Sequence, residues 1–212
     1  MGFLDRFKPQ PRWKHPDPAV RQAAVEALPH EEQEVIRGLA LEDPDAGVRR
    51  SALARVDDVE TIARLAKTDP DEQVRAEAKE LAVGLARDAT DEETGRRALT
   101  ALDDSRELTI VARGAEHEAV ALAALAGLDD PRVISVVARQ ANHGGVRLAA
   151  LARLESLDDL VVVATKTEHK DVGLAALDRI SAREPLELVA LRARNKVVAR
   201  RAKASARAIE EA

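Results

Sequence analysis

With 212 residues, 45% of them hydrophobic, and a net charge of −5, the chain is too apolar to be wholly disordered and long enough to bury a sizeable core. It has no cysteine, no tyrosine and three aromatic residues (Phe3, Phe7 and Trp13), which excludes disulfides, thiolate metal sites and base stacking beyond residue 13. No apolar run reaches the length of a membrane span or a signal peptide, so the sequence predicts a cytoplasmic protein with an aliphatic core.

Residues 1–16 stand outside the pattern that fills the rest of the chain. They hold all three aromatic residues and four bases against one acid, and their prolines bar a regular helix. A stack of repeats must cover the apolar face of its first unit. We therefore expect residues 1–16 to pack on the first repeat as an N-terminal plug. Docking at a membrane surface is the alternative, which the small apolar area of one helical turn opposes.

From residue 17 onward, one amphipathic helix recurs along the chain, with versions AVRQAAVEAL, GVRRSALARV, GVRLAALARL and DVGLAALDRI. The copies share a central alanine, at spacings of 28, 26 and 20 residues and then four times 26: Ala24, Ala52, Ala78, Ala98, Ala124, Ala150, Ala176 and Ala202. Valine stands four residues earlier in seven of the eight copies. This spacing predicts a helix that buries one face, and the small alanine predicts a close approach of two helix axes.

A second helix is expected between consecutive copies, as in VETIARLAKT and PRVISVVARQA. It has its own alanine position, at Ala66, Ala112, Ala138, Ala164 and Ala190. Acid pairs such as Asp57-Asp58, Asp103-Asp104 and Asp129-Asp130 precede several of these helices and are suited to cap their first turns. The short spacing between Ala78 and Ala98 marks an irregular unit, for which we expect one long helix over about residues 71–87.

Two helices in each 26-residue unit form an antiparallel hairpin that cannot bury its apolar face alone, so neighbouring hairpins must stack. The sequence therefore predicts an all-α fold, a right-handed α-solenoid of about seven to eight HEAT-like helical hairpins. This single solenoid domain is expected to cover residues 17–212, with the irregular unit around residues 78–98.

The motifs RWKHPDPAVRQAAV, EDPDAGVR, TDPDEQVR, LDDPRVISVVARQANHGGVRLAALARL and RNKVVARRAKASA together resemble a HEAT-repeat family. The chain is similar over nearly its whole length to the HEAT-repeat region of certain bacterial proteins. In that family the region precedes a long helical, coiled-coil-like domain of unknown function. The resemblance implies a helical repeat array, and it brings no catalytic residues and no activity.

Histidines are the first candidates for chemistry. The residue that begins each recurring helix is, in successive copies, Asp17, Asp45, Asp71, Asp91, His117, His143, His169 and Asn195. Packed helices lie about 8–10 Å apart, whereas imidazoles that share a metal ion lie about 2 Å from it, so the three histidines cannot share one ion. The pairs His30-Glu31 and His117-Glu118 are similar to those of deoxyhypusine hydroxylase, a HEAT-repeat di-iron enzyme, but two pairs are too few for its site. We expect loop or capping histidines, no metal, no cofactor and no enzyme activity.

In four copies of the recurring helix, arginine directly follows the valine that stands four residues before the alanine. These arginines are Arg21, Arg49, Arg75 and Arg147. We expect these side chains to bridge to an aspartate of the next turn and so form an internal ladder between repeats. Binding of phosphate is the alternative interpretation.

Leucine marks a candidate protein-binding groove. Leu122, Leu148 and Leu174 share one position of the fifth to seventh copies, flanked by Ala126 and Ala152, whereas earlier copies place Gln22, Arg50, Ala76 and Arg96 there. If this position faces outward, it forms an apolar groove for a partner helix or peptide. If it faces the neighbouring repeat, it is ordinary core.

The C-terminal end is the second candidate surface. Residues 192–212 carry seven bases and two acids, against a net charge of −13 over residues 17–191. The bases are Arg192, Arg194, Lys196, Arg200, Arg201, Lys203 and Arg207. We expect a non-catalytic protein-interaction scaffold, with nucleic-acid or ribonucleoprotein binding at this basic end as the alternative.

Overall fold

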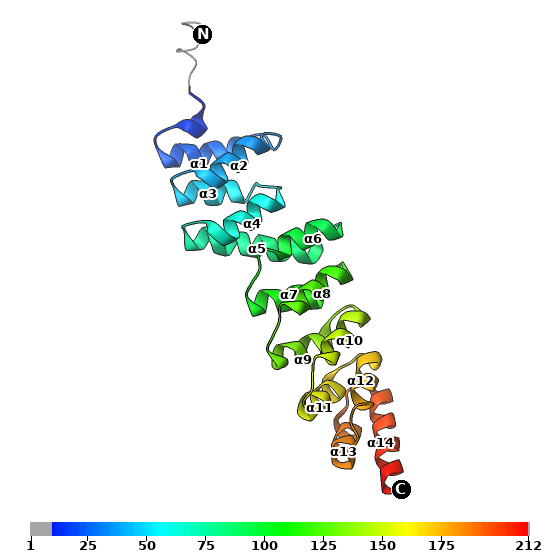
Figure 1. Cartoon of the computed structure of the whole chain (residues 1–212). Coiled ribbons are helices and arrows are strands. Elements are labelled where there is room, and N and C mark those ends of the chain that lie inside the picture. Colours follow the sequence, from blue (N-terminus) through cyan, green and yellow to red (C-terminus); the bar gives the residue numbers. More distant parts are fainter. Residues whose placement is uncertain (1–9, 212) are drawn as a thin grey trace. The chain divides into compact units, whose positions relative to one another are not determined.

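The structure is a computed structural model that describes residues 10–211, so the part of the plug prediction that concerns residues 1–9 lies outside the described residues. Within residues 10–211 the chain is all-helical, with fourteen α-helices, one short 3-10 helix and no β-strand (Figure 1). The prediction of an all-α fold is confirmed. In the same residues, no helix is long and apolar enough to cross a membrane.

The chain divides into two compact units, residues 1–82 and 83–212, with the boundary inside helix α5. The described helices that begin in the first unit are η2 (Arg12–Lys14), α1 (Pro18–Ala27), α2 (Gln33–Glu42), α3 (Ala46–Leu53), α4 (Val59–Thr68) and α5 (Glu72–Asp88). Those of the second unit are α6 (Glu92–Leu99), α7 (Ser105–Gly114), α8 (Glu118–Ala126), α9 (Pro131–Gln140), α10 (Gly144–Ala152), α11 (Leu157–Lys166), α12 (Lys170–Leu177), α13 (Arg183–Arg192) and α14 (Lys196–Glu210).

Helix α5 is the long helix that the short repeat spacing predicts. It has 17 residues, whereas each of the helices α1 to α4 has eight to ten. Its sequence, EQVRAEAKELAVGLARD, holds no proline and no aspartate before its last residue. Because no proline and no internal aspartate interrupts it, and a single glycine such as Gly84 is tolerated within a helix, the helix continues where other repeats have a connection between two helices.

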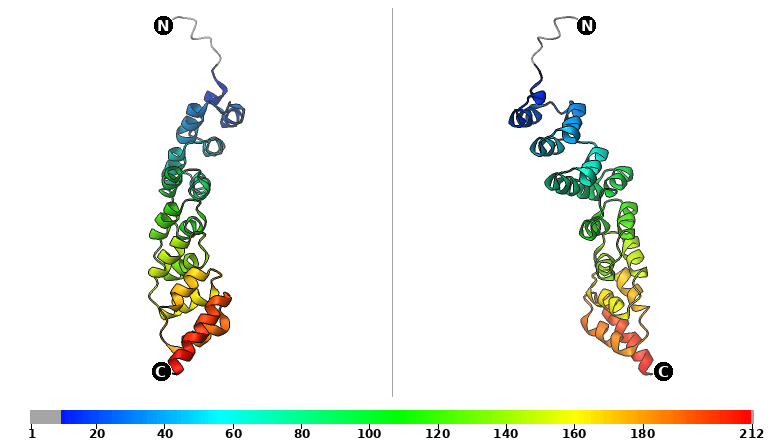
Figure 2. Two further views of the ribbon diagram at one scale, coloured as in Figure 1. Left: turned by 90° about the vertical axis from the view of Figure 1, so that its right-hand side faces the viewer. Right: turned by 60° about the vertical axis from the view of Figure 1, so that its left-hand side comes forward.

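In the second unit the helices form two rows. The recurring helices α6, α8, α10, α12 and α14 contact one another in succession, and the intervening helices α7, α9, α11 and α13 do the same. Each intervening helix also packs on the recurring helix that follows it in the chain. Both views in Figure 2 show these adjacent rows from green to red. The second unit is therefore a stack of similar helical hairpins.

The repeated small and branched residues form the core of each unit. All eight alanines of the recurring position are buried, and so are six of the seven valines that precede them, Val20 being half-buried. Of the second alanine set, four are buried and Ala190 is half-buried. The helix phase derived from the sequence is confirmed by this burial.

Gly173 shows how closely two recurring helices approach. It occupies the position after the valine, and a Cβ atom there would lie 2.7 Å from Cγ2 of Val198 on α14 and 3.1 Å from Cγ2 of Thr167. Earlier copies place Arg49 or Arg147 at the equivalent position. The contact between α12 and α14 leaves no room for a side chain there.

Aspartates cap the helices as the sequence predicts. Asp58, Asp104 and Asp130 each accept a hydrogen bond from a backbone N–H in the first turn of α4, α7 and α9. In the recurring helices, the side chains of Asp17, Asp45 and Asp91 do the same, and Asn195 accepts from two N–H groups of α14. These bonds satisfy backbone donors that have no partner within the helix.

The described part of the predicted plug begins at Gln10. Trp13 is half-buried in η2, which contacts α1, and it lines a hollow with Val35 and Leu39 of α2. This tryptophan thus lies against the first hairpin. The plug as a whole stays a prediction.

The buried alanine column makes a testable prediction. Replacing Ala150 with leucine should lower the free energy of unfolding by about 1–3 kcal/mol, because the larger side chain must fit where α10 contacts α8 and α12. Ala152 is exposed two residues later, and the same change there should alter stability by less than about 0.5 kcal/mol. Urea denaturation of both variants checks this, and equal losses would contradict the helix phase.

Candidate binding surfaces

The leucine position of the recurring helices lies at the surface of the second unit. Leu122 on α8 is 37% exposed, Leu148 on α10 is 44% exposed, and Leu174 on α12 is half-buried. Ala126 and Ala152 are exposed beside them. Because α8, α10 and α12 are neighbours in one row, the three leucines form a stripe across it, which we call the leucine stripe. Of the two interpretations left open by the sequence, the structure places these side chains outward.

The centre of the leucine stripe is apolar over all three helices. Between the leucines lie Ala123, Ala149 and Ala175, which are half-buried. The same helix position is occupied by an exposed arginine at either end, Arg96 on α6 and Arg200 on α14. Arg96 pairs with Glu92 on its own helix at 2.6 Å. The stripe is therefore bounded by charge at both ends.

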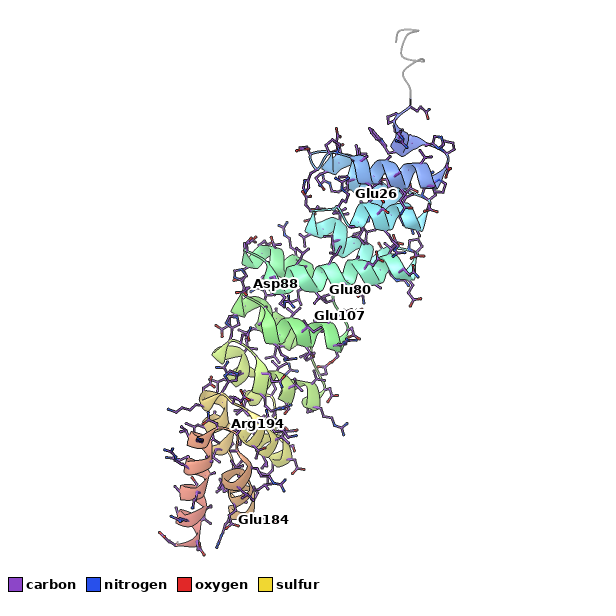
Figure 3. The ribbon with its side chains drawn as sticks, turned by 180° about the vertical axis from the view of Figure 1, so that it is seen from behind. Glu26, Glu80, Asp88, Glu107, Glu184 and Arg194 are labelled. Carbon is purple, nitrogen blue, oxygen red and sulfur yellow. The ribbon has the colours of Figure 1, made fainter. Side chains whose placement is uncertain are left out.

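The predicted basic surface is also at the protein's exterior. All seven bases are exposed: Arg192, Arg194, Lys196, Arg200, Arg201, Lys203 and Arg207. Four of them, at positions 196, 200, 203 and 207, follow the three- and four-residue spacing of one helix face. Charged side chains are exposed elsewhere too, among them Glu26 and Glu184, which Figure 3 labels.

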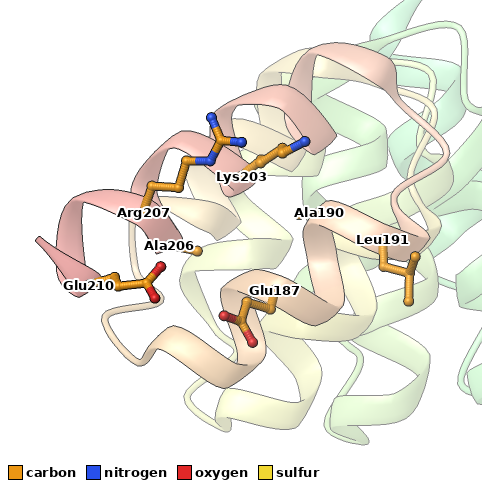
Figure 4. A pocket seen from close by; sticks show the side chains of 7 residues that line it. All are labelled: Glu187, Ala190, Leu191, Lys203, Ala206, Arg207 and Glu210. Carbon is orange, nitrogen blue, oxygen red and sulfur yellow. The ribbon is translucent and has the colours of Figure 1, made fainter.

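A hollow between α13 and α14 was not predicted from the sequence. It has a volume of about 380 Å³, and Ala190, Leu191, Lys203, Ala206 and Arg207 are among its lining residues (Figure 4). Leu191 is 82% exposed, more than any other exposed large hydrophobic side chain of residues 10–211. The sequence did carry a signal, because the equivalent position after the alanine is polar in the helices before it, at Lys67, Arg113, Arg139 and Thr165.

The predicted arginine ladder is present in the first unit. Asp43 accepts hydrogen bonds from Nε and Nη2 of Arg21, at 2.7 and 2.8 Å, and Asp69 accepts two from Nε and Nη2 of Arg49, both at 2.8 Å. All four side chains are nearly buried. Arg75 differs from the prediction: its Nη1 donates to the backbone oxygen of Asp69 in the turn before its own helix, at 2.7 Å, and the equivalent position of the next turn is Ala89. Arginine and aspartate thus link successive turns.

Burial and hydrogen bonding act in opposite directions on the ladder aspartates. Burial alone would raise the pKa of Asp69, but hydrogen bonds from Arg49 and from the Asp71 N–H outweigh it. The pKa of Asp69 therefore lies below its ordinary value, and the pKa of Asp43 is lowered in the same way by Arg21. Both groups are held ionised as structural partners of arginine.

In the second unit the ladder changes its components. Arg147 pairs with an aspartate of the next repeat, Asp171, at 2.6 Å. Asp171 lies on helix α12 itself, however, and not in the turn that precedes this helix. The turn position of Asp43 and Asp69 is taken by alanine at Ala89 and Ala115. The backbone oxygens of these alanines instead face Nε2 of His117, at 3.1 Å, and of His143, at 2.8 Å.

Of the two roles expected for the histidines, loop residue or helix cap, the structure contradicts only side-chain capping. His117, His143 and His169 stand at the N-cap positions of α8, α10 and α12, but none of these side chains accepts a cap hydrogen bond. His117 and His143 reach back to the turn of the preceding repeat, because an imidazole is long enough to bridge it. Within residues 10–211, no group of three or more His, Cys, Asp or Glu side chains could hold a metal ion.

A second set of arginines was missed by the sequence reasoning. Arg153 donates to the backbone oxygens of Leu125 and Leu128, and Arg179 donates to those of Leu151 and Leu154. Arg55 makes the equivalent bonds to Val25 and Leu28 in the first unit. Each arginine thus satisfies carbonyls at the end of the preceding recurring helix. The recurring letters ARV, ARL and DRI carried this signal.

The fold and these surfaces define an all-helical protein of repeated helices, in which buried polar groups link the repeats and apolar side chains lie outside them. Comparison of the chain with family models, with curated proteins and with solved structures found no match.

Proposed function

We propose that the chain is a HEAT-like repeat protein, a right-handed α-solenoid that acts as a non-catalytic protein-binding scaffold in the cytoplasm. The observation that carries the proposal is the leucine stripe, because Leu122 and Leu148 are exposed side by side on neighbouring helices. Contiguous apolar surface of this kind marks sites of protein interaction.

The chemistry of the leucine stripe favours an α-helix as the bound segment. An extended peptide has unpaired backbone N–H and C=O groups, which need polar partners on the receptor. Around Leu148, the neighbouring side chains along the stripe are Ala149 and Ala152, which offer none. An α-helix satisfies its own backbone and needs only apolar contact along one face.

Leu148 provides the test. Replacing it with glutamate should abolish capture of the protein partner from a nuclease-treated lysate, while circular dichroism and the thermal midpoint stay unchanged. Leu81 on α5 is exposed to a similar degree, at 40%, but stands at a different helix position, so Leu81→Glu is the matched control and should retain capture.

Three results would contradict the proposal. Unfolding of the Leu148→Glu protein would show that the leucine belongs to the core. Undiminished capture by that variant would remove the leucine stripe as the site. Loss of all capture by the wild type after nuclease treatment would favour the alternative function, nucleic-acid binding through the basic C-terminal residues.

A further inference from the structure

The last hairpin, α13 and α14, carries an apolar surface that is separate from the leucine stripe. Leu191 projects from α13 beside the hollow of about 380 Å³, in which Ala190 and Ala206 lie between the two helices (Figure 4). A second hollow, of about 400 Å³, shares Leu191 with the first and is lined by Leu157 and Leu188, both of which are exposed, and by the acids Asp158 and Glu184. A single exposed leucine is common, but one between two hollows with further exposed leucines forms a docking surface.

The charges around the first hollow are unevenly compensated. Its two acids, Glu187 and Glu210, both pair with Arg183, at 2.7 and 3.1 Å. Among residues 10–211, no acidic side chain pairs with its two bases, Lys203 and Arg207. Lys196 and Arg200 extend the same face of α14. The α14 side of the first hollow is therefore positive, and a partner with negative charge on that flank fits it.

We propose that this hairpin docks an amphipathic α-helix of another protein, with its apolar face on Leu191 and Ala190 and the acids of one flank against Lys203 and Arg207. A helix meets both requirements, because residues three and four apart share a face while acids occupy its flank. This site is additional to the leucine stripe and does not depend on it.

Two other occupants fit the surface less well. A nucleic acid would use the bases but leave Leu191 and both hollows uncovered, and the chain has no aromatic residue after Trp13 on which a base could stack. A second copy of this chain would bring two identical ends together. Residues 192–212 carry seven bases and two acids, so like charges would oppose such a contact.

The test uses the full chain and labelled synthetic peptides in fluorescence anisotropy titrations. The probe is a helical peptide with leucines along one face and glutamates on one flank. A peptide of the same composition with scrambled leucine positions, a peptide with lysine in place of glutamate, and a single-stranded oligonucleotide serve as comparisons. We expect the leucine–glutamate peptide to bind most tightly.

The variants separate apolar contact from charge. Leu191→Glu should weaken binding of the leucine–glutamate peptide about tenfold or more, as expected for a central apolar contact. The double variant Lys203→Glu with Arg207→Glu should lose a similar factor and should now bind the lysine peptide better than the wild type does. Arg201→Glu, on another face of α14, is the matched charge control and should change the affinity by less than about threefold.

Specific outcomes overturn the proposal. These are no binding of the leucine–glutamate peptide by the wild type, equal affinity for the scrambled peptide, tighter binding of the oligonucleotide, or self-association that Leu191→Glu abolishes. Leu148→Glu distinguishes this site from the leucine stripe: retained peptide binding supports a separate site, and loss of binding in that folded variant contradicts it.

Discussion

Replacing Asp69 with alanine is expected to lower the free energy of unfolding by about 3–5 kcal/mol. Asp69 is 5% exposed and accepts two hydrogen bonds from Arg49, which is itself buried. Removing the carboxylate leaves the guanidinium charge in a place that water reaches poorly. The loss is therefore the cost of an uncompensated buried charge rather than of one hydrogen bond. Urea denaturation followed by circular dichroism measures it.

The adjacent arginine supplies the control. Arg50 pairs with Glu77 through its Nε at 2.9 Å, but both side chains are about two-fifths exposed. Water screens such a pair, so Glu77→Ala should cost no more than about 1 kcal/mol. A loss at Asp69 as small as that at Glu77 would show that the ladder does not stabilise the first unit.

Acid should reduce the difference between the wild type and Asp69→Ala. Because the folded-state pKa of Asp69 is lowered, its ion pair contributes stability above the pKa of the unfolded chain, about 3.9. That contribution is lost as pH falls through the folded-state pKa. The two unfolding free energies should therefore converge below about pH 4. A difference that stays constant with pH would assign the effect of the substitution to something other than the charge.

Repetition is why so much of the fold could be predicted. Ala150 and Val146 are small or branched residues at positions that recur every 26 residues in this part of the chain. Aligning the copies with one another therefore shows which helix face is buried, even where a single copy departs from the pattern. Helix α5 was predictable for the opposite reason, since its segment has no proline and no internal aspartate of the kind found between the helices of other repeats. The missed carbonyl contacts of Arg153 and Arg179 depend on how far a flexible side chain reaches, which no spacing specifies.

The candidate sites were less predictable because exposure depends on neighbours. The position of Leu148 was identified from the sequence, but whether it faced solvent or the next helix required the packing of α8, α10 and α12. Leu191 escaped notice although the equivalent positions of α7, α9 and α11 hold the polar residues Arg113, Arg139 and Thr165. A periodic pattern assigns the same exposure to every copy of a position. The actual exposure of a side chain depends on which helices pack against that particular copy.

Leu154 offers the second large effect, in the same repeat as the leucine stripe. It is 1% exposed, and Leu154→Ala should lower the free energy of unfolding by about 2–5 kcal/mol, because the truncation removes apolar contacts and leaves a cavity. Leu148→Ala deletes the same atoms from a side chain that is 44% exposed, and should cost less than about 1 kcal/mol. Urea denaturation of the two proteins measures the contrast.

The comparison of these two leucines bears on function as well as on stability. Exposing a leucine to water is unfavourable, and Leu148 is expected to contribute little to folding. We propose that its role at the surface is to contact a binding partner. If Leu148→Ala destabilises the protein as much as Leu154→Ala does, the leucine stripe is part of the core and the proposed scaffold function loses its main support. If the costs differ as expected, Leu148→Glu can be interpreted as a binding variant, because the fold does not depend on that side chain.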